Sequence, residues 1–225
     1  MSEMHKVSSL LQTEVGELKK VSMESVLKPM KRVVRDSSKV CHKKVEFSTE
    51  GEDLRVDSSL GKLFSNILVH MLRNSVDHGI ESPEVRKKRG KSESGNVHLR
   101  AYEYMENIVV EVEDDGNGID LERVKKKALE KGLYSQQELS LMSDARAYQI
   151  LFESGFSTAD QVTEVSGRGV GMDMVKSSVE EMRGKISIKS TLGMGSKFSI
   201  SVPIPRSVLI INSLSVLCQD QMYSI

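Results

Sequence analysis

The sequence of 225 residues lacks the features that would tie it to a membrane or to a nucleic acid. No apolar run approaches the ~20 residues that span a bilayer, and residues 1–6 do not have the pattern of a signal peptide. Lysine and arginine together number 32, as do aspartate and glutamate, so the formal net charge is zero. Balanced charge gives no general attraction to nucleic acid or to anionic lipid. We therefore expect a soluble cytoplasmic protein, or the soluble part of one, with no membrane insertion and no nucleic-acid partner.

Cysteines and aromatic residues are also scarce. The spacing of Cys41 and Cys218 fits neither a metal site nor a disulfide framework, which favours reduced thiols. Tryptophan is absent and aromatic residues make up 4% of the chain, so the core must rest on valine, isoleucine, leucine and the twelve methionines. The pattern G-x-x-x-x-G-K-[ST] is missing as well, which excludes a nucleotide site of the P-loop kind.

Hydrophobic periodicity predicts a chain of interspersed helices and strands. Apolar residues at helical spacing indicate one broken helix, or two short ones, over residues 8–41, with the break at Pro29. Asp57 or Ser58 is the expected N-cap of a helix that carries the apolar residues from Leu60 to Leu72. Further helices are expected at 121–131, 143–151 and 170–183, and strands at 44–49, 96–104, 108–112, 185–190, 197–202, 208–211 and 214–217.

The residues that carry chemistry gather in four segments of fixed order. They are 70–78 (His-Met-Leu-Arg-Asn-Ser-Val-Asp-His), 114–118 (Asp-Asp-Gly-Asn-Gly), 167–171 (Gly-Arg-Gly-Val-Gly) and 193–196 (Gly-Met-Gly-Ser). One glycine motif is weak evidence, but four such elements within ~130 residues, the size of one domain, are hard to obtain by chance. Together they predict a nucleotide site.

Segment 114–118 directly follows an expected strand, which places a carboxylate beside a tight turn. We expect Asp114 to accept a hydrogen bond from an adenine amino group, while the glycines let the base approach the backbone. Asp115 is expected to be solvated. The alternative is a plain β-turn with no ligand.

The helix that ends near residue 74 offers a metal ligand. Asn74 presents a neutral oxygen that can bind Mg²⁺, which keeps several waters and needs few protein ligands. The alternative is an asparagine hydrogen-bonded within a buried helix. His70 and His78 stand four residues to either side, but no third ligand or H-E-x-x-H pattern supports zinc. Phosphate contacts or polar packing are the roles expected of these histidines.

Three further segments bear on a phosphate site. Gly167, Gly169 and Gly171 precede a helix, where free backbone amides can cradle phosphates. The stretch 153–168 is expected to be a flexible loop whose part 154–159 closes as a lid, with Phe152 and Phe156 as anchors. The basic run at 123–127 is either a solvated helix face or a set of phosphate contacts. The run 86–91 is expected to be an exposed loop, and His98 to be structural.

At this point the chain resembles the ATPases of the gyrase, heat-shock chaperone, histidine kinase and mismatch-repair type. Within them it is similar to the chemotaxis histidine kinases of the CheA family. The matching segments are 70–81, 113–120, 156–159 and 167–173, within a resemblance that covers residues 20–204. The resemblance implies an α/β two-layer sandwich in which a mixed sheet is backed by helices, with an N-terminal helical segment and ATP bound under a lid.

The resemblance also assigns roles to residues of this chain. Asp114 would bind adenine and Asn74 the Mg²⁺, while His70, His78 and Lys127 would contact the phosphates, and Gly195 and Ser196 would close the base pocket. The implied catalytic residues are His70, Asn74 and Lys127. The implied nucleotide-binding residues are Asn74, Asp77, His78, Asp114, Gly116, Gly118, Arg123, Lys127, Gly167, Arg168, Gly169, Val170, Gly171, Gly195 and Ser196.

Two positions depart from the family pattern without arguing against activity. Arg123 stands where lysine is common, and Ser196 where threonine is usual. A third position separates transfer from hydrolysis. Hydrolytic members carry a glutamate four residues before the asparagine, whereas this chain has His70 there and lacks that general base. Transfer of the γ-phosphoryl to an acceptor histidine needs no such base, because positioning and charge neutralisation supply the catalysis.

The acceptor histidine itself is expected on a separate domain, because neither His5 nor His42 has the acidic neighbour expected of one. We expect a partial dimerisation or linker segment at 1–41, the kinase catalytic domain at 42–204, and the start of a truncated regulatory domain at 205–225. The implied partners are the phosphoacceptor domain, a response regulator, a coupling protein with its receptor array, and a second copy in a homodimer. The alternatives are a hydrolytic conformational ATPase and a non-catalytic, nucleotide-gated scaffold.

Overall fold

The computed structural model describes residues 19–156 and 171–205, and the backbone of two short strands at 215–218 and 221–224. The chain divides into two compact units, residues 20–204 and a second unit of 1–19 with 205–225. In the second unit β8 (Ser215–Cys218) pairs antiparallel with β9 (Gln221–Ser224). The strand expected at 208–211 lies outside the described residues. Among the described residues, no helix is long and apolar enough to cross a membrane.

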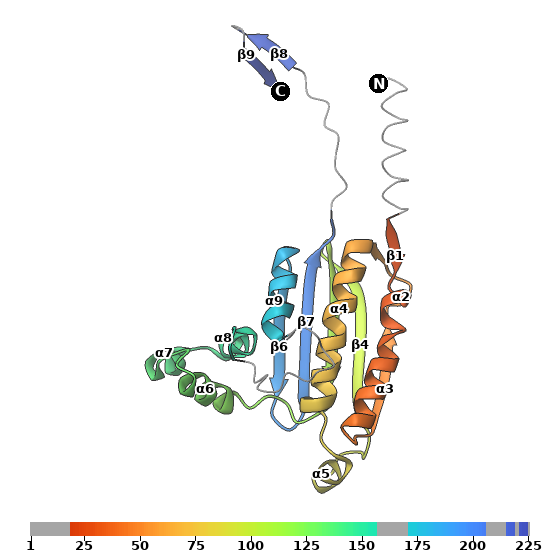
Figure 1. Cartoon of the computed structure of the whole chain (residues 1–225), viewed down its shortest axis with the longest axis vertical. Helices are drawn as coiled ribbons and strands as arrows, with labels where there is room; N and C mark the ends of the chain where they lie inside the picture. The colour runs from red at the N-terminus through yellow and green to blue at the C-terminus, as the bar shows by residue number, and fades with distance from the viewer. Residues whose placement is uncertain (1–18, 157–170, 206–214, 219–220, 225) are drawn as a thin grey trace. The chain divides into compact units, whose positions relative to one another are not determined.

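The larger unit is built on a five-stranded mixed sheet of order β2-β4-β5-β7-β6 (Figure 1). Its strands are β2 (Val45–Glu50), β4 (Gly95–Tyr104), β5 (Asn107–Asp114), β6 (Lys185–Thr191) and β7 (Gly195–Pro203). The pair β2 and β4 is parallel, and every other pair in this sheet is antiparallel. All five strands were predicted from the sequence. A separate pair of β1 (Lys20–Ser22) and β3 (Arg55–Asp57) was not, because three-residue strands are too short to show a period. The helical expectation for residues 8–41 was therefore wrong at residues 20–22.

One face of the sheet is covered by helices, which makes the two-layer sandwich (Figure 1). These are α2 (Glu24–Leu27), α3 (Met30–Val40), α4 (Ser58–Asn74) and α9 (Met172–Glu181). The core between the layers joins Phe64, Leu68 and Leu72 of α4 to Val110 and Val112 of β5, all fully buried. Alternate residues of β5 point into this core because side chains on a strand alternate between its two faces. The expected fold class is confirmed.

Capping residues set where the covering helices begin. The Asp57 carboxylate accepts a hydrogen bond from the Ser59 amide at 2.8 Å, which confirms Asp57 as the N-cap of α4. Pro29 directly precedes α3, as expected for a residue without an amide donor. Residues 20–41 lie in the larger unit, and α3 packs on α4. The reading of residues 1–41 as a dimerisation segment stays a prediction.

A group of short helices forms a flank beside the sheet, next to β6 (Figure 1). It contains α6 (Leu121–Glu130), α7 (Gln136–Leu141), α8 (Asp144–Gln149) and the 3-10 helix η2 (Ile150–Phe152). A small core of Val124, Ala128, Leu139, Ile150 and Phe156 joins them. The helix expected at 143–151 is thus α8 continued by η2. The six-residue helices α7 and α5 (Pro83–Lys88) were missed, because two turns are too few for a clear period.

Candidate functional site

A cavity of about 450 Å³ lies between the end of α4, the turn after β5, α6 and the start of β7. It gathers residues from three of the four segments that the sequence singled out. The fourth, 167–171, lies outside the described residues except for Gly171. The cavity is lined by Asn74, Ser75, His78, Gly79, Asp114, Asn117, Gly118, Ile119, Asp120, Arg123, Val124, Lys127, Leu151, Phe156, Met172, Ser196 and Phe198.

One wall comes from the end of α4, which continues as the π-helical turn η1 (Ser75–Gly79). Asn74 and His78 line the cavity from this wall. The Asn74 amide nitrogen donates to the Met172 sulfur at 3.1 Å, so the carboxamide is held at the junction of α4 and α9. His70, one turn earlier on α4, is not among the lining residues. Asp77 is exposed and is not among the lining residues, and its Oδ2 lies 3.6 Å from Nε2 of His78.

The end of β5 supplies a buried carboxyl group. Asp114 is 5% exposed, and the Gly116 amide donates to its Oδ1 at 3.0 Å. Burial raises the pKa of Asp114 to about 6, although hydrogen bonds from the Gly116 and Ser196 amides act in the opposite direction. The Asp114 carboxyl therefore lies in the cavity wall, where burial disfavours its charged form. A hydrogen-bond donor on a bound ligand would stabilise that charged form.

Ser75 adds a second polar group beside Asp114. Its hydroxyl lies near enough to lower the pKa of Asp114. Yet Ser75 Oγ is buried, and no group in the described part of the chain lies in hydrogen-bonding geometry with it. Buried polar atoms are nearly always satisfied by protein, water or ligand. This pair is therefore suited to a polar ligand edge, such as a purine base with its water.

The start of β7 contributes Ser196 to the cavity lining, while Gly195 lies outside it. Ser196 pairs with Asp114 in the β5–β7 register and is 6% exposed. Gly195 has a φ of 125°, and a Cβ on it would lie 1.9 Å from the Asp114 carbonyl oxygen. Only glycine allows β7 to start this close to the end of β5.

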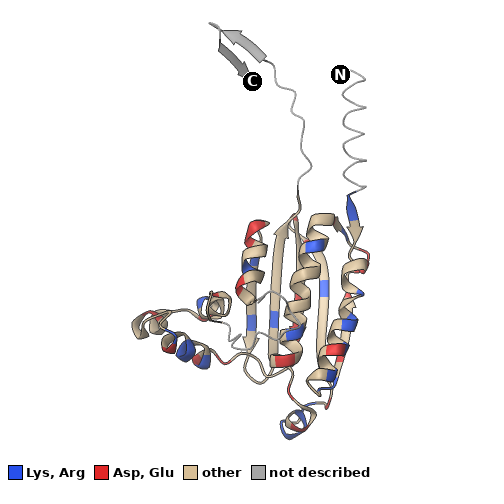
Figure 2. Cartoon of the chain, viewed as in Figure 1, with Lys and Arg blue, Asp and Glu red and all other residues tan. Residues whose placement is uncertain are grey.

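The opposite wall is basic and comes from α6. Asp120 caps this helix by accepting from the Arg123 amide at 3.1 Å. Arg123 and Lys127 line the cavity, and the Lys127 ammonium lies 5.3 Å from the centre of the Phe156 ring. Lys125 and Lys126 pair instead with glutamates of the same helix. Basic residues cluster on α6 (Figure 2), but only Arg123 and Lys127 of the run line the cavity.

Comparison with known proteins identifies the family to which this chain belongs. The family model described as "Histidine kinase-, DNA gyrase B-, and HSP90-like ATPase" matches residues 63–206. The chain belongs to this ATPase family.

Curated relatives of the ATPase family match the whole chain. The chemotaxis protein CheA of Bacillus subtilis is 39% identical over 225 residues, which is 100% of this chain and 33% of the relative. The sensor histidine kinase CheAY of Helicobacter pylori is 40% identical over 225 residues, or 28% of its length. The chain thus spans about a third of the length of these relatives.

Solved structures agree on the fold. The catalytic domain of the histidine kinase ThkA superposes with a TM-score of 0.52 at 17% identity, covering 82% of this chain and 94% of that domain. At this identity the likeness supports the fold of the ATPase family and nothing finer.

The catalytic and nucleotide-binding residues expected of this ATPase-family chain fall into three groups. Those that line the cavity are Asn74, His78, Asp114, Gly118, Arg123, Lys127 and Ser196. Those described but outside the lining are His70, Asp77, Gly116, Gly171 and Gly195. Those outside the described residues are Gly167, Arg168, Gly169 and Val170, together with most of the loop expected at 153–168. Gly171 is the extended N-cap of α9.

The apolar part of the lining was not predicted, apart from Phe156. Ile119, Val124, Leu151, Met172 and Phe198 line the cavity. In the sequence each of them belongs to an ordinary apolar pattern, so no local signal separates cavity wall from core. The close packing of a flat aromatic base is what such a wall provides in nucleotide and small-molecule sites.

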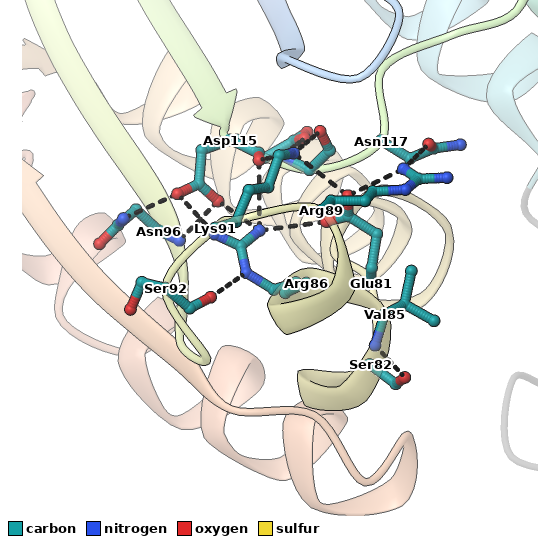
Figure 3. Close-up of polar contacts among 12 residues, drawn as sticks. Glu81, Ser82, Val85, Arg86, Arg89, Lys91, Ser92, Asn96, Asp115 and Asn117 are labelled. Atoms are coloured by element: carbon teal, nitrogen blue, oxygen red, sulfur yellow. Dashed lines mark hydrogen bonds and ion pairs between the residues drawn. The ribbon is translucent and has the colours of Figure 1, made fainter.

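Two expectations about charge were partly wrong. Asp115 is only partly solvated, with its side chain 36% exposed. In the run 86–91, residues 87–90 are exposed as expected, but the run begins on the helix α5 and the Arg86 side chain is 1% exposed. Its guanidinium pairs with the Asp115 carboxylate at 3.0 Å (Figure 3). Partial burial acts to raise the pKa of Asp115, but hydrogen bonds from Asn96 and Arg86 and the charge of Arg86 lower it below its usual value.

The residues present fit a nucleotide with a weakly held Mg²⁺. In the described part of the chain, no group of three His, Cys, Asp or Glu side chains is placed to hold a metal. Mg²⁺ keeps most of its water shell and needs one or two protein oxygens, so the Asn74 carboxamide on the cavity wall is sufficient. The unsatisfied Ser75 hydroxyl beside Asp114 fits the base end of the same ligand.

Proposed function

We propose that this chain is the ATP-binding catalytic core of a histidine kinase that transfers the γ-phosphoryl group to a histidine on a separate domain. The observation that carries the proposal is the Asp114 carboxyl, buried in the wall of a cavity that Arg123 and Lys127 also line. A base-recognising acceptor and phosphate-neutralising cations in one cavity are the two requirements of ATP binding.

In this proposal the ionised Asp114 accepts a hydrogen bond from the adenine amino group. Asn74 would provide one oxygen to a Mg²⁺ bound with the nucleotide. Lys127, Arg123 and His78 neutralise and orient the phosphates, with His70 one turn away on α4. Gly171 and the segment before it would contribute amides at the N-terminus of α9. Bound Mg²⁺ would reduce the charge of the transferred group, and the side chains would position it for the acceptor imidazole.

Transfer is favoured over hydrolysis because both acidic residues of the described cavity lining already have other roles. Among the described lining residues these are Asp114 and Asp120. Asp114 is assigned to the base, and Asp120 is engaged as the N-cap of α6. No lining carboxylate within the described ranges is thus left to activate water, and the position four before Asn74 is His70. A hydrolase needs such a base, whereas transfer to an imidazole does not.

The partners proposed for the whole protein follow from its relatives. Proteins named for chemotaxis and for sensor histidine kinase activity match this chain over its full length. We infer that the acceptor domain lies elsewhere in a longer protein or on a partner, and that a response regulator receives the phosphoryl group. A coupling protein, a receptor array and a homodimer complete the proposed cytoplasmic assembly.

The test is phosphoryl transfer in trans. The purified chain is mixed with γ-labelled ATP, Mg²⁺ and the acceptor domain of a CheA relative, and label on that domain is followed in time. We expect acid-labile label on the acceptor histidine, lost on chelation of Mg²⁺ and in Asn74→Ala. ATP binding without transfer to any acceptor domain would contradict the kinase assignment.

The same mixture separates the alternatives. A hydrolytic ATPase releases inorganic phosphate without an acceptor, and His70→Ala abolishes that release. A nucleotide-gated scaffold keeps its signalling output in Asn74→Ala, whereas a kinase loses it.

A further inference from the structure

A cluster of charged side chains holds the turn after β5. Arg86 and Lys91 contact Asp115, and Lys91 also contacts Gly116 (Figure 3). Glu81 pairs with both cations, and we call these three residues the turn clamp. None of the three lines the cavity. The clamp lies on and around α5, the segment whose sequence alone suggested a solvated loop.

The Arg86 side chain contacts both the carboxylate and the main-chain carbonyl of Asp115. Its two terminal nitrogens donate to the two carboxylate oxygens at 3.0 Å each, and Nη1 also donates to the Asp115 carbonyl at 3.2 Å. Its Nε donates to the Ser92 carbonyl at 2.7 Å. The planar guanidinium matches a carboxylate in this bidentate geometry, which fixes orientation as well as distance.

Lys91 reaches the same turn as a point charge. Its ammonium donates to the carbonyl oxygens of Asp115 at 2.8 Å and Gly116 at 2.7 Å. A third contact, at 3.1 Å, goes to Glu81, which also pairs with Arg86. Partial burial acts to raise the pKa of Glu81, but hydrogen bonds and the charges of Lys91 and Arg86 lower it. Glu81 therefore stays ionised and ties the two cations together.

The two carbonyls that Lys91 holds belong to the two peptide units that flank Gly116. The unit containing the Asp115 carbonyl also contains the Gly116 amide, which donates to Asp114 Oδ1 at 3.0 Å. The unit containing the Gly116 carbonyl also contains the Asn117 amide, which donates to the Gly79 carbonyl at 2.8 Å. Because a peptide unit is planar, fixing its carbonyl fixes the direction of its N–H.

We propose that Lys91 and Arg86 are positioning residues for adenine recognition, acting on the Asp114 carboxyl through the peptide units around Gly116. One peptide plane aims the carboxyl, and the other anchors the turn to Gly79 at the cavity wall. The cations also polarise these peptides, which strengthens the hydrogen bonds that their amides donate. The inference rests on the proposed ATP site but concerns residues that never touch the nucleotide.

The test is the variant Lys91→Met, which keeps the apolar stem and removes the ammonium. Glu81 retains its pairs with Arg86 and Arg89, so no buried charge is left alone. Lys87→Met is the matched control, because Lys87 lies on α5 with its side chain 71% exposed and pairs with Glu93. For each protein the dissociation constants of Mg-ADP and Mg-GDP are measured by calorimetry, together with hydrogen exchange over residues 113–118.

We expect Lys91→Met to bind Mg-ADP about tenfold more weakly, the scale of one hydrogen bond to a charged group, with Mg-GDP affinity unchanged. The preference for adenine over guanine then falls by the same factor, and exchange at 113–118 becomes faster. Lys87→Met behaves as wild type. Equal weakening of both nucleotides shows a merely structural role, and wild-type affinities in Lys91→Met show no role. Either result overturns the inference.

Failure of the proposed function gives a different pattern. In that case the wild-type chain itself binds neither nucleotide, and the inference falls with the ATP site. Arg86→Lys provides a second variant, which keeps the charge and loses the bidentate fork. It is expected to lower the ADP-to-GDP preference with little loss of GDP affinity. If Arg86→Lys does not fold, Lys91→Met decides alone, because its side chain is 20% exposed and leaves the buried Arg86 pair intact.

Discussion

The amide of Asn117 donates to the carbonyl of Gly79 at 2.8 Å, which joins the turn after β5 to the turn after α4. The two turns directly follow the residues assigned to the base and to the metal, Asp114 at the end of β5 and Asn74 at the end of α4. A Cβ on Gly116 would lie 2.2 Å from that same Gly79 carbonyl oxygen. The junction is therefore closed to any side chain at residue 116, and the spacing of the two halves of the site depends on it.

Gly116→Ala is expected to push these turns apart. Because backbone stands in the way, we expect a loss of about 1–3 kcal/mol in the free energy of unfolding and at least ~10-fold weaker ADP binding. Urea denaturation and calorimetry measure the two effects. Gly132→Ala is the control, since nothing lies within 4 Å of a Cβ there and the left-handed backbone costs about 1 kcal/mol. Nucleotide affinity equal in the two variants would contradict this prediction.

The pKa of Asp114 predicts an unusual pH dependence of stability. Its folded-state value is about 6 against an ordinary 3.8, so the folded state binds the proton more tightly than the unfolded state. Stability is therefore lost as pH rises from about 4 to about 6, by a contribution on the order of 3 kcal/mol. Urea denaturation of wild type and Asp114→Asn over pH 4.5 to 7 should show the difference between them growing with pH in favour of the variant.

Nucleotide binding should follow the opposite trend. The acceptor of the adenine amino group is the ionised carboxyl, so wild-type affinity for ADP is expected to rise as pH passes through about 6. Asp114→Asn should bind at least ~10-fold more weakly and show no such rise. An affinity independent of pH between 5 and 7 in the wild type would count against Asp114 as the base contact.

Lys127 and Lys126 are neighbours in sequence with different surroundings. Lys127 lines the cavity, whereas Lys126 is 77% exposed and pairs with Glu130 at 4.0 Å. Removing a cation that stabilises the transferred phosphoryl group should lower kcat/KM for phosphotransfer about 100-fold in Lys127→Ala. Lys126→Ala should remain at the wild-type rate. Equal rates in the two variants would place the phosphates away from α6.

The ion pair of Arg86 should matter for folding as well as for binding. Arg86→Ala leaves Asp115 and Glu81 without their buried partner, which typically costs 3–5 kcal/mol, so a loss of about that size is expected. Lys28→Ala removes an exposed pair with Glu24 and should leave the denaturation midpoint unchanged. Similar midpoints for both variants would show that the Arg86 pair is replaced by water.

Much of the site was predictable because its signals are local. A β-branched run that ends in Asp114, and glycines at 116, 118 and 195, are written in adjacent residues. Their meaning depends on backbone geometry that the neighbouring residues already impose. The spacing of His70 and Asn74 likewise predicts a shared face of α4. It does not predict how far along the helix the cavity extends, and His70 lies outside the lining.

The rest depended on contacts between distant residues. Arg86 bonds to Asp115, 29 residues away, and Lys91 bonds to Gly116, 25 residues away. In sequence both cations belong to a basic run of the kind that is usually solvated.

The sequence by itself thus predicted the ATPase-family fold and several polar residues that line the cavity, because periodicity, caps and glycines act over a few residues. The tertiary structure alone decided which charges are buried behind that site. Burial of a charge depends on a partner brought by the fold, and no local pattern records that partner.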